Sequence, residues 1–515
     1  MSTEIDAPPP VHSKRDVVQA MSGLMLGMFV AILAGTVVSN ALPRIVAELK
    51  GSQSIFAWIV TVELLAMTAT VPLWGKLADL YSRKLLIQAS LGLFVAGSLI
   101  AGFSQNIEML IVSRVVQGLG AGGVTALATI VMAAMIPPRE LGRYSGLFGA
   151  VFGVGTVAGP LIGGLLVDTS WLGWRWCFFI GVPFSLAAIW LLQRTLHLPV
   201  VRKDNVKIDY LGAFLIVSGV STLLIWSSLA GQKFDWWSGW TALLVTVGVL
   251  LLVAAVRVEA TAHDPIVPLS IFRNRTVSLA TIASALVGVA MFGGTVFLSQ
   301  YFQLSLGKTP TQAGLLGLPL IFGLLISSTV AGQLITKYGK WKAFLVAGGV
   351  TMVGGMLLLS TITAQTTVFM VSVHMFVLGV GVGLLMQNLV LAAQNDVPAK
   401  DLGTTTSTLT FFRSLGGAIG VSALGAVLAT KVSSLTAEKF GPVASGGDAV
   451  PDISVLPPEI KAVIADIYAT ATAEIFLVGA PFAVLALLAV AFIKEKPLKE
   501  QSGDDRLAAE MAAGH

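Results

Sequence analysis

The stretch "GKLADLYSRKL", Gly75–Leu85, is a short charged interruption between two long apolar runs. A second stretch, "GQLITKYGKWK", Gly332–Lys342, repeats its pattern of Gly, any residue and Leu, with basic residues seven to nine positions after the Gly. Each stretch stands where an apolar run ends. The repeat therefore indicates a chain built from two related halves with matched short loops.

The composition around these loops is that of an integral membrane protein. Of the 515 residues, 55% are hydrophobic and only 11% are charged, an apolar fraction too high for a soluble globule to bury. The net charge is +5, but the basic residues are spread between apolar runs and form no patch interleaved with aromatic residues. We therefore expect the lipid bilayer as a partner and no nucleic acid.

Apolar runs of membrane-spanning length recur along the whole chain. A bilayer core of roughly 30 Å needs about 20 apolar residues in a helix, and the first run is too long for a signal peptide. The sequence thus predicts an all-α membrane fold of fourteen spans. The predicted spans are 17–42, 56–75, 85–104, 109–136, 144–167, 174–194, 209–230, 239–257, 276–303, 312–335, 343–363, 368–393, 404–430 and 475–493.

The distribution of basic residues predicts the orientation. With the amino terminus in the cytoplasm, most of the 32 Lys and Arg residues fall on the inner side, as the positive-inside rule requires. We therefore expect a multi-pass protein of the cytoplasmic (inner) membrane with both termini in the cytoplasm. The predicted parts are an N-terminal segment 1–16, a six-helix bundle 17–194, a two-helix hairpin 209–257, a second six-helix bundle 276–493 with an external loop 431–474, and a tail 494–515.

The two inner loops are candidates for a gate. Gly75 and Gly332 would let two helices approach closely, and charges beside them could hold an inner gate closed through contacts with helix ends. The alternative is that these charges only set topology around a tight turn. The candidate gating residues are Gly75, Asp79, Arg83, Lys84, Gly332 and Lys340.

The first loop also resembles the signature of the major facilitator superfamily, within it the fourteen-span drug:proton antiporters. Asp79 and Arg83 stand at its charged positions, whereas Ser82 replaces the usual Gly. "LIVSRVVQGLGAGG", Leu110–Gly123, is similar to the fourth-span motif of that family, which implies a role for Arg114 in proton coupling. A guanidinium in a span keeps its charge and needs an anion or a polar cage, and Gln117 lies on the same helical face.

"GTVAGPLIGG", residues 155–164, resembles the fifth-span motif that distinguishes antiporters from symporters. Three glycines recur every fourth residue and form one flat helical face, while the proline removes a backbone hydrogen bond and kinks the helix. Such a helix can act as a pivot and a seal, although the glycines could serve packing alone. The motif residues are Gly155, Gly159, Pro160, Gly163 and Gly164.

Glu63 is a carboxylate within the apolar run "TVELLAMTATVPLWG". The resembled branch commonly has an aspartate in its first span, where Ala34 stands here, so Glu63 is a candidate replacement. Counted from Phe56 it lies about 10 Å deep, a depth similar to that of Arg114. We expect the two charges to face each other, reach the cavity and couple transport to protons. The alternatives are a protonated Glu63 that bonds a neighbouring helix or one in an outer water-filled vestibule.

Other polar residues in the spans are candidates for lining a cavity, although such groups often bond neighbouring helices instead. These candidates are Gln117, His374, Gln387, Asn388 and Arg413. No zinc-binding pattern occurs, and "LGKTPT" lacks the first Gly of a phosphate-binding loop because Phe302 stands there. We therefore expect no metal and no cofactor, with a proton as the coupling ion, and a protein that functions as a monomer.

These features together predict a secondary transporter and not an enzyme. The leading hypothesis is proton-gradient-driven efflux of amphipathic drugs or other toxic small molecules by alternating access, which would confer antibiotic resistance. A facilitator or symporter for a small metabolite is the first alternative, and the "GTVAGPLIGG" motif disfavours it. An intramembrane lipid-modifying protein is the second, and the spans contain no convergent set of His, Asp or Cys to support it.

Overall fold

The chain folds into helices throughout the part that its structure, a computed structural model, describes. The described residues are 14–49, 53–137, 172–196, 209–230, 234–262, 265, 267–440 and 457–501, with scattered positions between 140 and 169. Within these residues there is no strand, and one isolated bridge joins Ala230 to Phe234. The predicted all-α class is confirmed.

Along the chain, two sets of helices are separated by a pair, α8 and α9. The first half contains α1 (Lys14–Glu48), α2 (Gln53–Leu80), α3 (Arg83–Gly102), α4 (Ile107–Met135), α6 (Trp176–Phe179) and α7 (Gly181–Thr195). The pair is α8 (Tyr210–Leu229) and α9 (Gly239–Thr261). The second half contains η1 (Leu269–Arg273), α10 (Arg275–Leu304), α11 (Pro310–Leu316), α12 (Leu318–Tyr338), α13 (Lys342–Leu359), α14 (Val368–Asp396), η2 (Ala399–Asp401), α15 (Leu402–Phe440) and α16 (Pro458–Ala491).

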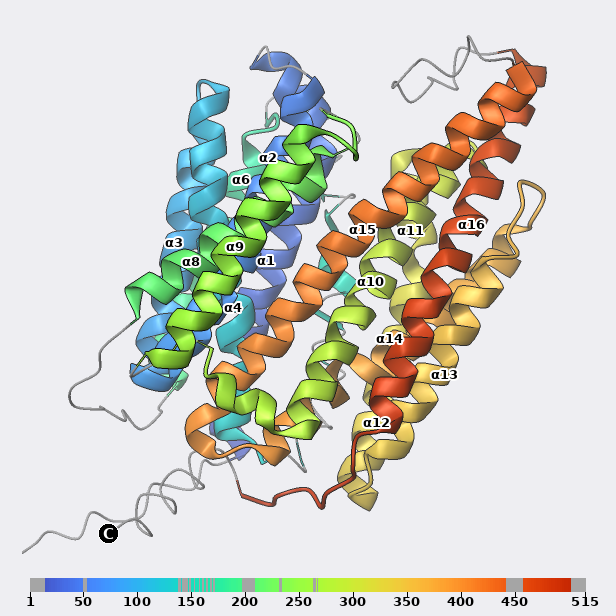
Figure 1. Ribbon diagram of the computed structural model, residues 1–515. Helices are drawn as coiled ribbons and strands as arrows, with labels where there is room; N and C mark the ends of the chain where they lie inside the picture. The colour runs from blue at the N-terminus through green and yellow to red at the C-terminus, as the bar shows by residue number, and fades with distance from the viewer. Residues whose placement is uncertain are drawn as a thin grey trace, which may run out of the picture.

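Each half packs as its own bundle (Figure 1). In the first bundle, α2 and α3 pack against α4, and α1 packs against α7. In the second bundle, α10 packs against α15, while α12 and α13 pack against α14. We call the end of the molecule that carries the Gly75–Leu85 loop the inner end and the opposite end the outer end.

Several helices begin at a polar cap that the sequence supplies. A side-chain oxygen of the capping residue accepts a backbone N–H that has no partner within the helix. Caps of this kind begin α4, α8, α9, α10 and α14, and the capping residues are Asn106, Asp209, Ser238, Asn274 and Thr367.

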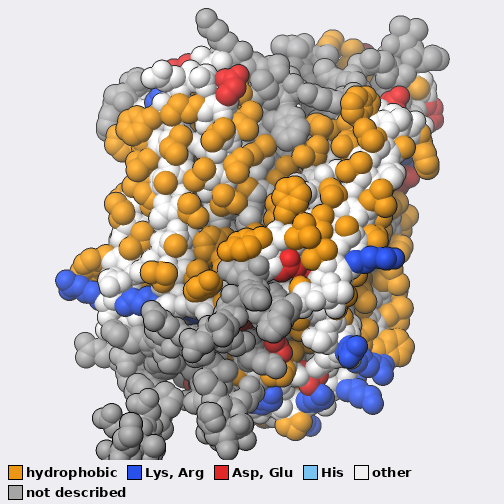
Figure 2. Space-filling model, turned by 60° about the vertical axis from the view of Figure 1, so that its left-hand side comes forward, with side chains coloured by type: hydrophobic (Ala, Val, Ile, Leu, Met, Phe, Trp, Pro, Cys, Tyr) orange, Lys and Arg blue, Asp and Glu red, His pale blue; other side chains and the backbone are white. Residues whose placement is uncertain are grey.

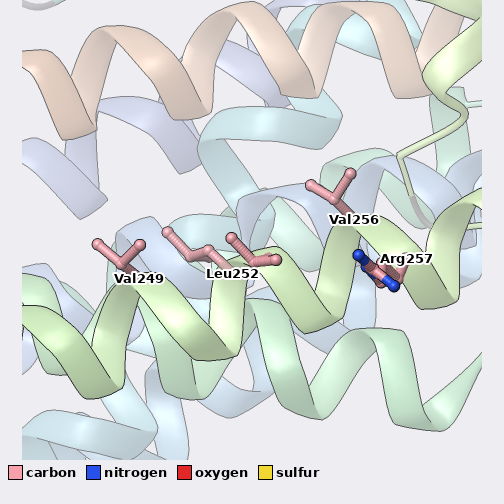
Figure 3. A pocket seen from close by; sticks show the side chains of 5 residues that line it. Val249, Leu252, Val256 and Arg257 are labelled. Carbon is pink, nitrogen blue, oxygen red and sulfur yellow. The ribbon is translucent and has the colours of Figure 1, made fainter.

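The α8–α9 pair lies at the side of the bundles. The two helices pack against each other, and α8 also contacts α2 and α15. Many apolar side chains of α9 are exposed, as lipid-facing residues are in a membrane protein. A shallow groove of about 330 Å³ runs along α9 (Figure 3) and is lined by Val249, Leu252, Val253, Val256 and Arg257.

Eleven of the described helices are long and apolar enough to cross a membrane. Three of the fourteen predicted spans are outside that set. The described part of α8 forms a shorter apolar helix, α2 runs for 28 residues and carries Glu63, and the fifth predicted span, 144–167, is described only at scattered positions. Figure 2 shows one face of the molecule, where apolar side chains cover a broad belt and Lys and Arg side chains gather toward the inner end.

Residues 431–474, expected as an external loop, are largely helical. Helix α15 continues to Phe440 and α16 already begins at Pro458, so the two helices account for most of that range. The first Gly and Pro after Lys431 are Gly441 and Pro442, and until that point nothing stops the helix. An ion pair of 2.7 Å between Lys431 and Glu474 joins the two extensions.

The start of the predicted polar tail is also ordered by contacts. Glu495 Oε1 accepts the backbone N–H groups of Trp341 and Lys342 at 2.8 and 3.0 Å, which caps the start of α13. Lys496 pairs with Asp396 at the end of α14, and the Trp341 indole donates to the Lys496 carbonyl oxygen at 2.9 Å. This segment therefore straps the inner ends of α13 and α14 together.

Candidate functional site

An ion pair between α2 and α4 forms the first candidate site. The Arg114 guanidinium contacts the Glu63 carboxylate and donates to Gln117 Oε1 at 2.6 Å and to the Ile59 carbonyl oxygen at 3.3 Å. Glu63 is 5% exposed and Arg114 is 0% exposed. The structure thus brings these two sequence-predicted residues together, and it encloses them in protein in this conformation instead of opening them to a cavity.

A polar and aromatic cage completes the surroundings of Arg114. Gln117 Nε2 donates to Ser98 Oγ of α3 at 2.8 Å, and the Phe178 ring of α6 lies 5.8 Å from the guanidinium carbon. Sequence analysis identified Gln117 but neither Ser98 nor Phe178, because residues so distant in sequence give no local signal. The cage offsets the cost of a charge in the membrane interior. Glu63 can take up a proton, whereas Arg114 stays charged.

A contact between the two bundles lies at the inner end. Gly75 of α2 packs directly against Ser407 of α15, and a Cβ at Gly75 would overlap the Ser407 side chain. Four residues further on, Asp79 accepts the backbone N–H groups of Gly403 and Thr404 at 3.0 and 2.9 Å, and also the Thr404 hydroxyl. Asp79 therefore holds the first turn of α15, where backbone N–H groups and the helix dipole favour an anion.

Asp79 lies beyond the apolar run of α2, and its protonation is shifted. Burial raises the pKa of Asp79 to about 6, although hydrogen bonds from Thr404 and Gly403 and the nearby charge of Arg83 act in the opposite direction. The carboxyl group therefore titrates close to physiological pH instead of near its usual value.

Of the remaining candidate gating residues, Arg83 acts on Asp79 through its nearby charge. Lys84 donates to the Gln193 carbonyl oxygen of α7 at 2.7 Å, and Arg83 donates to the Ala78 carbonyl oxygen at 3.3 Å. Gly332 is buried within α12, and Lys340 is exposed. Thr336, at the position that corresponds to Asp79, donates to the Gly332 carbonyl oxygen of its own helix. The two loops share a pattern but make different contacts.

The fifth-span glycines pack against α1. A Cβ at Gly159 would overlap Thr36, and the Thr36 hydroxyl donates to the Gly155 carbonyl oxygen at 3.1 Å. Gly163 is buried as well. Pro160 and Gly164 lie outside the described residues.

The candidates in the second half are separated from one another. His374 is 7% exposed, and its Nδ1 has no hydrogen-bond partner among the described residues. Asn388 donates to the Leu384 carbonyl oxygen at 2.7 Å, and Gln387 is half-buried on the same helix. Arg413 is a half-buried residue of α15. Within the described residues, no three His, Cys, Asp or Glu side chains form a group that could hold a metal ion.

The two helical bundles contact each other at the inner end, and the first bundle encloses a pair of opposite charges. The sequence profile of the Major Facilitator Superfamily matches residues 24–421. The chain therefore belongs to this superfamily of membrane transporters, as the sequence motifs predicted.

Curated relatives point to the same class. The chain is 36% identical over 507 residues to an uncharacterized MFS-type transporter of Mycobacterium tuberculosis, an alignment that covers 98% of this chain and 73% of the relative. It is 34% identical to the multidrug transporter protein MdtP of Bacillus subtilis, with 84% and 78% covered. It is 31% identical to multidrug resistance protein 3 of the same organism, with 93% and 95% covered.

A solved structure supports the fold. The human organic anion transporter MFSD10 (TETRAN) superposes with a TM-score of 0.59 over 93% of this chain and 100% of that chain. Its sequence identity is 14%, so the likeness concerns the fold alone.

Proposed function

We propose that the protein exports amphipathic drugs or other toxic small molecules in exchange for protons. The observation that carries this proposal is the enclosed Glu63–Arg114 pair, in a chain whose relatives include multidrug transporters. A carboxylate in the membrane interior is costly and is typical of a proton or ion pathway.

Proton uptake by Glu63 would change the balance of charges in the first bundle. Protonation neutralises the carboxylate, while Arg114 keeps its positive charge and its bonds to Gln117 and Ile59. The bundle then holds an uncompensated cation, which favours a conformation that releases the proton again. We assign the coupling of export to protons to this link between the protonation of Glu63 and the conformation of the bundle.

The contact at the inner end would be the gate of an alternating-access cycle. Inward opening requires Gly75 to separate from Ser407 and Asp79 to leave the first turn of α15. The glycine face of the fifth span against Thr36 would act as the pivot. Because backbone contacts this close leave no intermediate spacing, the halves switch between discrete packed states.

The proposal includes a location and a mode of operation. The inner end faces the cytoplasm of a cell whose inner membrane holds the protein, because Lys and Arg side chains gather there. Both termini are cytoplasmic, the transporter works as a monomer in the bilayer, and it needs no cofactor besides the coupling proton.

Everted membrane vesicles provide the test. The vesicles are given a preset pH gradient, reported by acridine fluorescence, and then ethidium, chloramphenicol or a dansyl-labelled fatty acid is added. We expect at least one compound to dissipate the gradient in vesicles that contain the protein and none to do so in vesicles without it. Transport of a compound with no proton movement would indicate a facilitator, and proton movement in the same direction as the compound would indicate a symporter.

A further inference from the structure

The predicted spans contain three Asp, Glu, Lys or Arg side chains that lie more than one residue from the end of a span. They are Glu63, Arg114 and Arg413. The first two pair with each other in the first bundle. Arg413 is the single such charge in the second bundle, because the predicted spans of residues 276–493 contain no Asp or Glu.

Packing against α10 fixes the position of Arg413. Gly288 of α10 lies directly against the Arg413 carbonyl oxygen, and Gly416 on the next turn lies against Ala285. The two backbones are thus in close contact along this part of α15. Counted from Leu402, Arg413 lies about 16 Å along the helix, near the middle of a bilayer core of roughly 30 Å.

The Arg413 guanidinium has no hydrogen bond or ion pair with any residue in the described part of the chain. Its side chain is half-buried, so part of it remains accessible. Two acidic residues of this half already have basic partners, since Asp396 pairs with Lys496 at the end of α14 and Glu474 of α16 pairs with Lys431 of α15. A guanidinium does not lose its proton in a protein, so it needs an anion that the bundle itself does not supply.

We propose that Arg413 binds the anionic group of a substrate, a carboxylate or sulfonate carried by an amphipathic molecule. The proposal rests on the proposed export function and names its substrate class. A planar guanidinium can hold such a group through two parallel hydrogen bonds. Helix α15 also contacts α2 and α4 of the first bundle, so a substrate at this helix lies where the halves meet.

The charges also favour an anion over a cation. A cationic substrate needs an available carboxylate, but Glu63, the single carboxylate inside the predicted spans, is occupied by Arg114. Arg413 repels a cation at the same time. The preference therefore follows from a balance of charges that differs between the bundles.

Ligand binding to the purified full-length protein tests this inference without a proton gradient. The probe is a dansyl-labelled undecanoic acid, and the comparison is its methyl ester, both measured by fluorescence in a neutral detergent and chloride-free buffer. We expect wild-type protein to bind the acid at least about tenfold more tightly than the ester. A hydrogen bond to a charged group changes a binding constant by at least about this factor.

Variants assign the preference to one side chain. Arg413→Gln should remove the preference, and Arg413→Lys should retain part of it. Lys431→Gln, which removes a cation from the outer end of the same helix, should leave it unchanged. If Arg413→Gln cannot be purified, the wild-type preference for the acid and its partial retention in Arg413→Lys still test whether Arg413 binds the carboxylate.

Two outcomes would overturn the inference: a wild-type protein that binds acid and ester equally, or an Arg413→Gln variant that keeps the wild-type ratio. Loss of acid binding when chloride is added at physiological concentration would also overturn it, because the site would then belong to an inorganic anion. Proton-coupled export without this preference would contradict the inference alone. The preference without any proton movement would contradict the proposed function alone.

Discussion

The two bundles treat charge in the membrane interior differently. The first bundle encloses a complete pair, Glu63 with Arg114, and surrounds it with Gln117 and Ser98. The predicted spans of the second bundle contain Arg413 and no acidic residue. Repeated architecture thus does not imply repeated chemistry, and the proposals above assign protons to the first bundle and the anionic group of the substrate to the second.

The inner loops differ in the same way. Asp79 of the first loop reaches across to Gly403 and Thr404 in the other bundle. Thr336, at the matching place of the second loop, bonds within its own helix. A shared sequence pattern therefore gives one contact between the halves and one local bond.

The largest expected effect compares the buried Arg114 with the half-buried Arg413. Arg114→Ala leaves Glu63 as an unpaired buried carboxylate and should lower the free energy of unfolding by about 3–5 kcal/mol. Arg413→Ala breaks no pair and should change it by less than about 1 kcal/mol. Unfolding in mixed detergent micelles measures both values. Equal losses in the two variants would contradict the proposed difference between the bundles.

The close packing at Gly75 predicts the next largest effect. Gly75→Leu places a side chain where Ser407 lies and should hold the inner ends apart, with export reduced at least about tenfold. Gly92→Leu is the matched control, because nothing lies within 4 Å of a Cβ at Gly92. Spin labels at Tyr81 and Pro398, in a Cys177→Ser background, report the separation. An unchanged distance in Gly75→Leu would show that this contact is not the gate.

Much of the fold was predictable from sequence because the membrane imposes it. Apolar runs gave the all-α class, and the motifs around Asp79 and Arg114 gave the superfamily. Depth along the helices also placed Glu63 opposite Arg114. These features depend on local sequence and on the thickness of the bilayer.

Contacts between distant segments were not predictable in this way. No local pattern indicates that Asp79 accepts hydrogen bonds from α15, or that Ser98 and Phe178 complete the cage of Arg114. Nor does any local pattern indicate that Glu495 caps α13. Such contacts arise from tertiary packing, which a single sequence does not specify locally.

Asp79→Asn should have a moderate effect on export. The variant loses the negative charge at the first turn of α15, so we expect export to slow several-fold while substrate affinity stays unchanged. Thr336→Ala in the second loop should alter neither quantity. Transport rates and binding constants for both variants check this, and a loss of binding in Asp79→Asn would place the residue in the substrate site instead.

The pH dependence of the gate follows from the same residue. The pKa of Asp79 is about 6 in the closed contact and would return to about 3.9 in water when the contact opens. The closed contact therefore binds a proton at Asp79 more tightly than the open one, so protonation stabilises the closed contact. This stabilisation is complete below about pH 4 and is lost as pH rises through about 6. The spin-label distance should show this shift between pH 4.5 and 7.5. Asp79→Asn should abolish it.

The smallest expected effect concerns the strap at the end of the second bundle. Burial alone would raise the pKa of Asp396. Hydrogen bonds from Lys496, Thr276 and Asn274 outweigh burial and lower this pKa below its usual value. Lys496→Ala should cost about 0.5–1 kcal/mol of stability at pH 7, since Lys496 itself is largely exposed. That difference should shrink as pH falls below about 4. Stability curves at pH 7 and pH 4 measure it.

Glu63→Gln tests the central claim, that this side chain couples export to protons, most directly. The amide keeps the size and a hydrogen-bond acceptor for Arg114 but cannot exchange a proton at physiological pH. In proteoliposomes we expect the variant to exchange labelled drug for unlabelled drug without a gradient, as the wild type does, but to move no protons when drug is added. Wild-type proton movement for each drug molecule in Glu63→Gln would contradict the account.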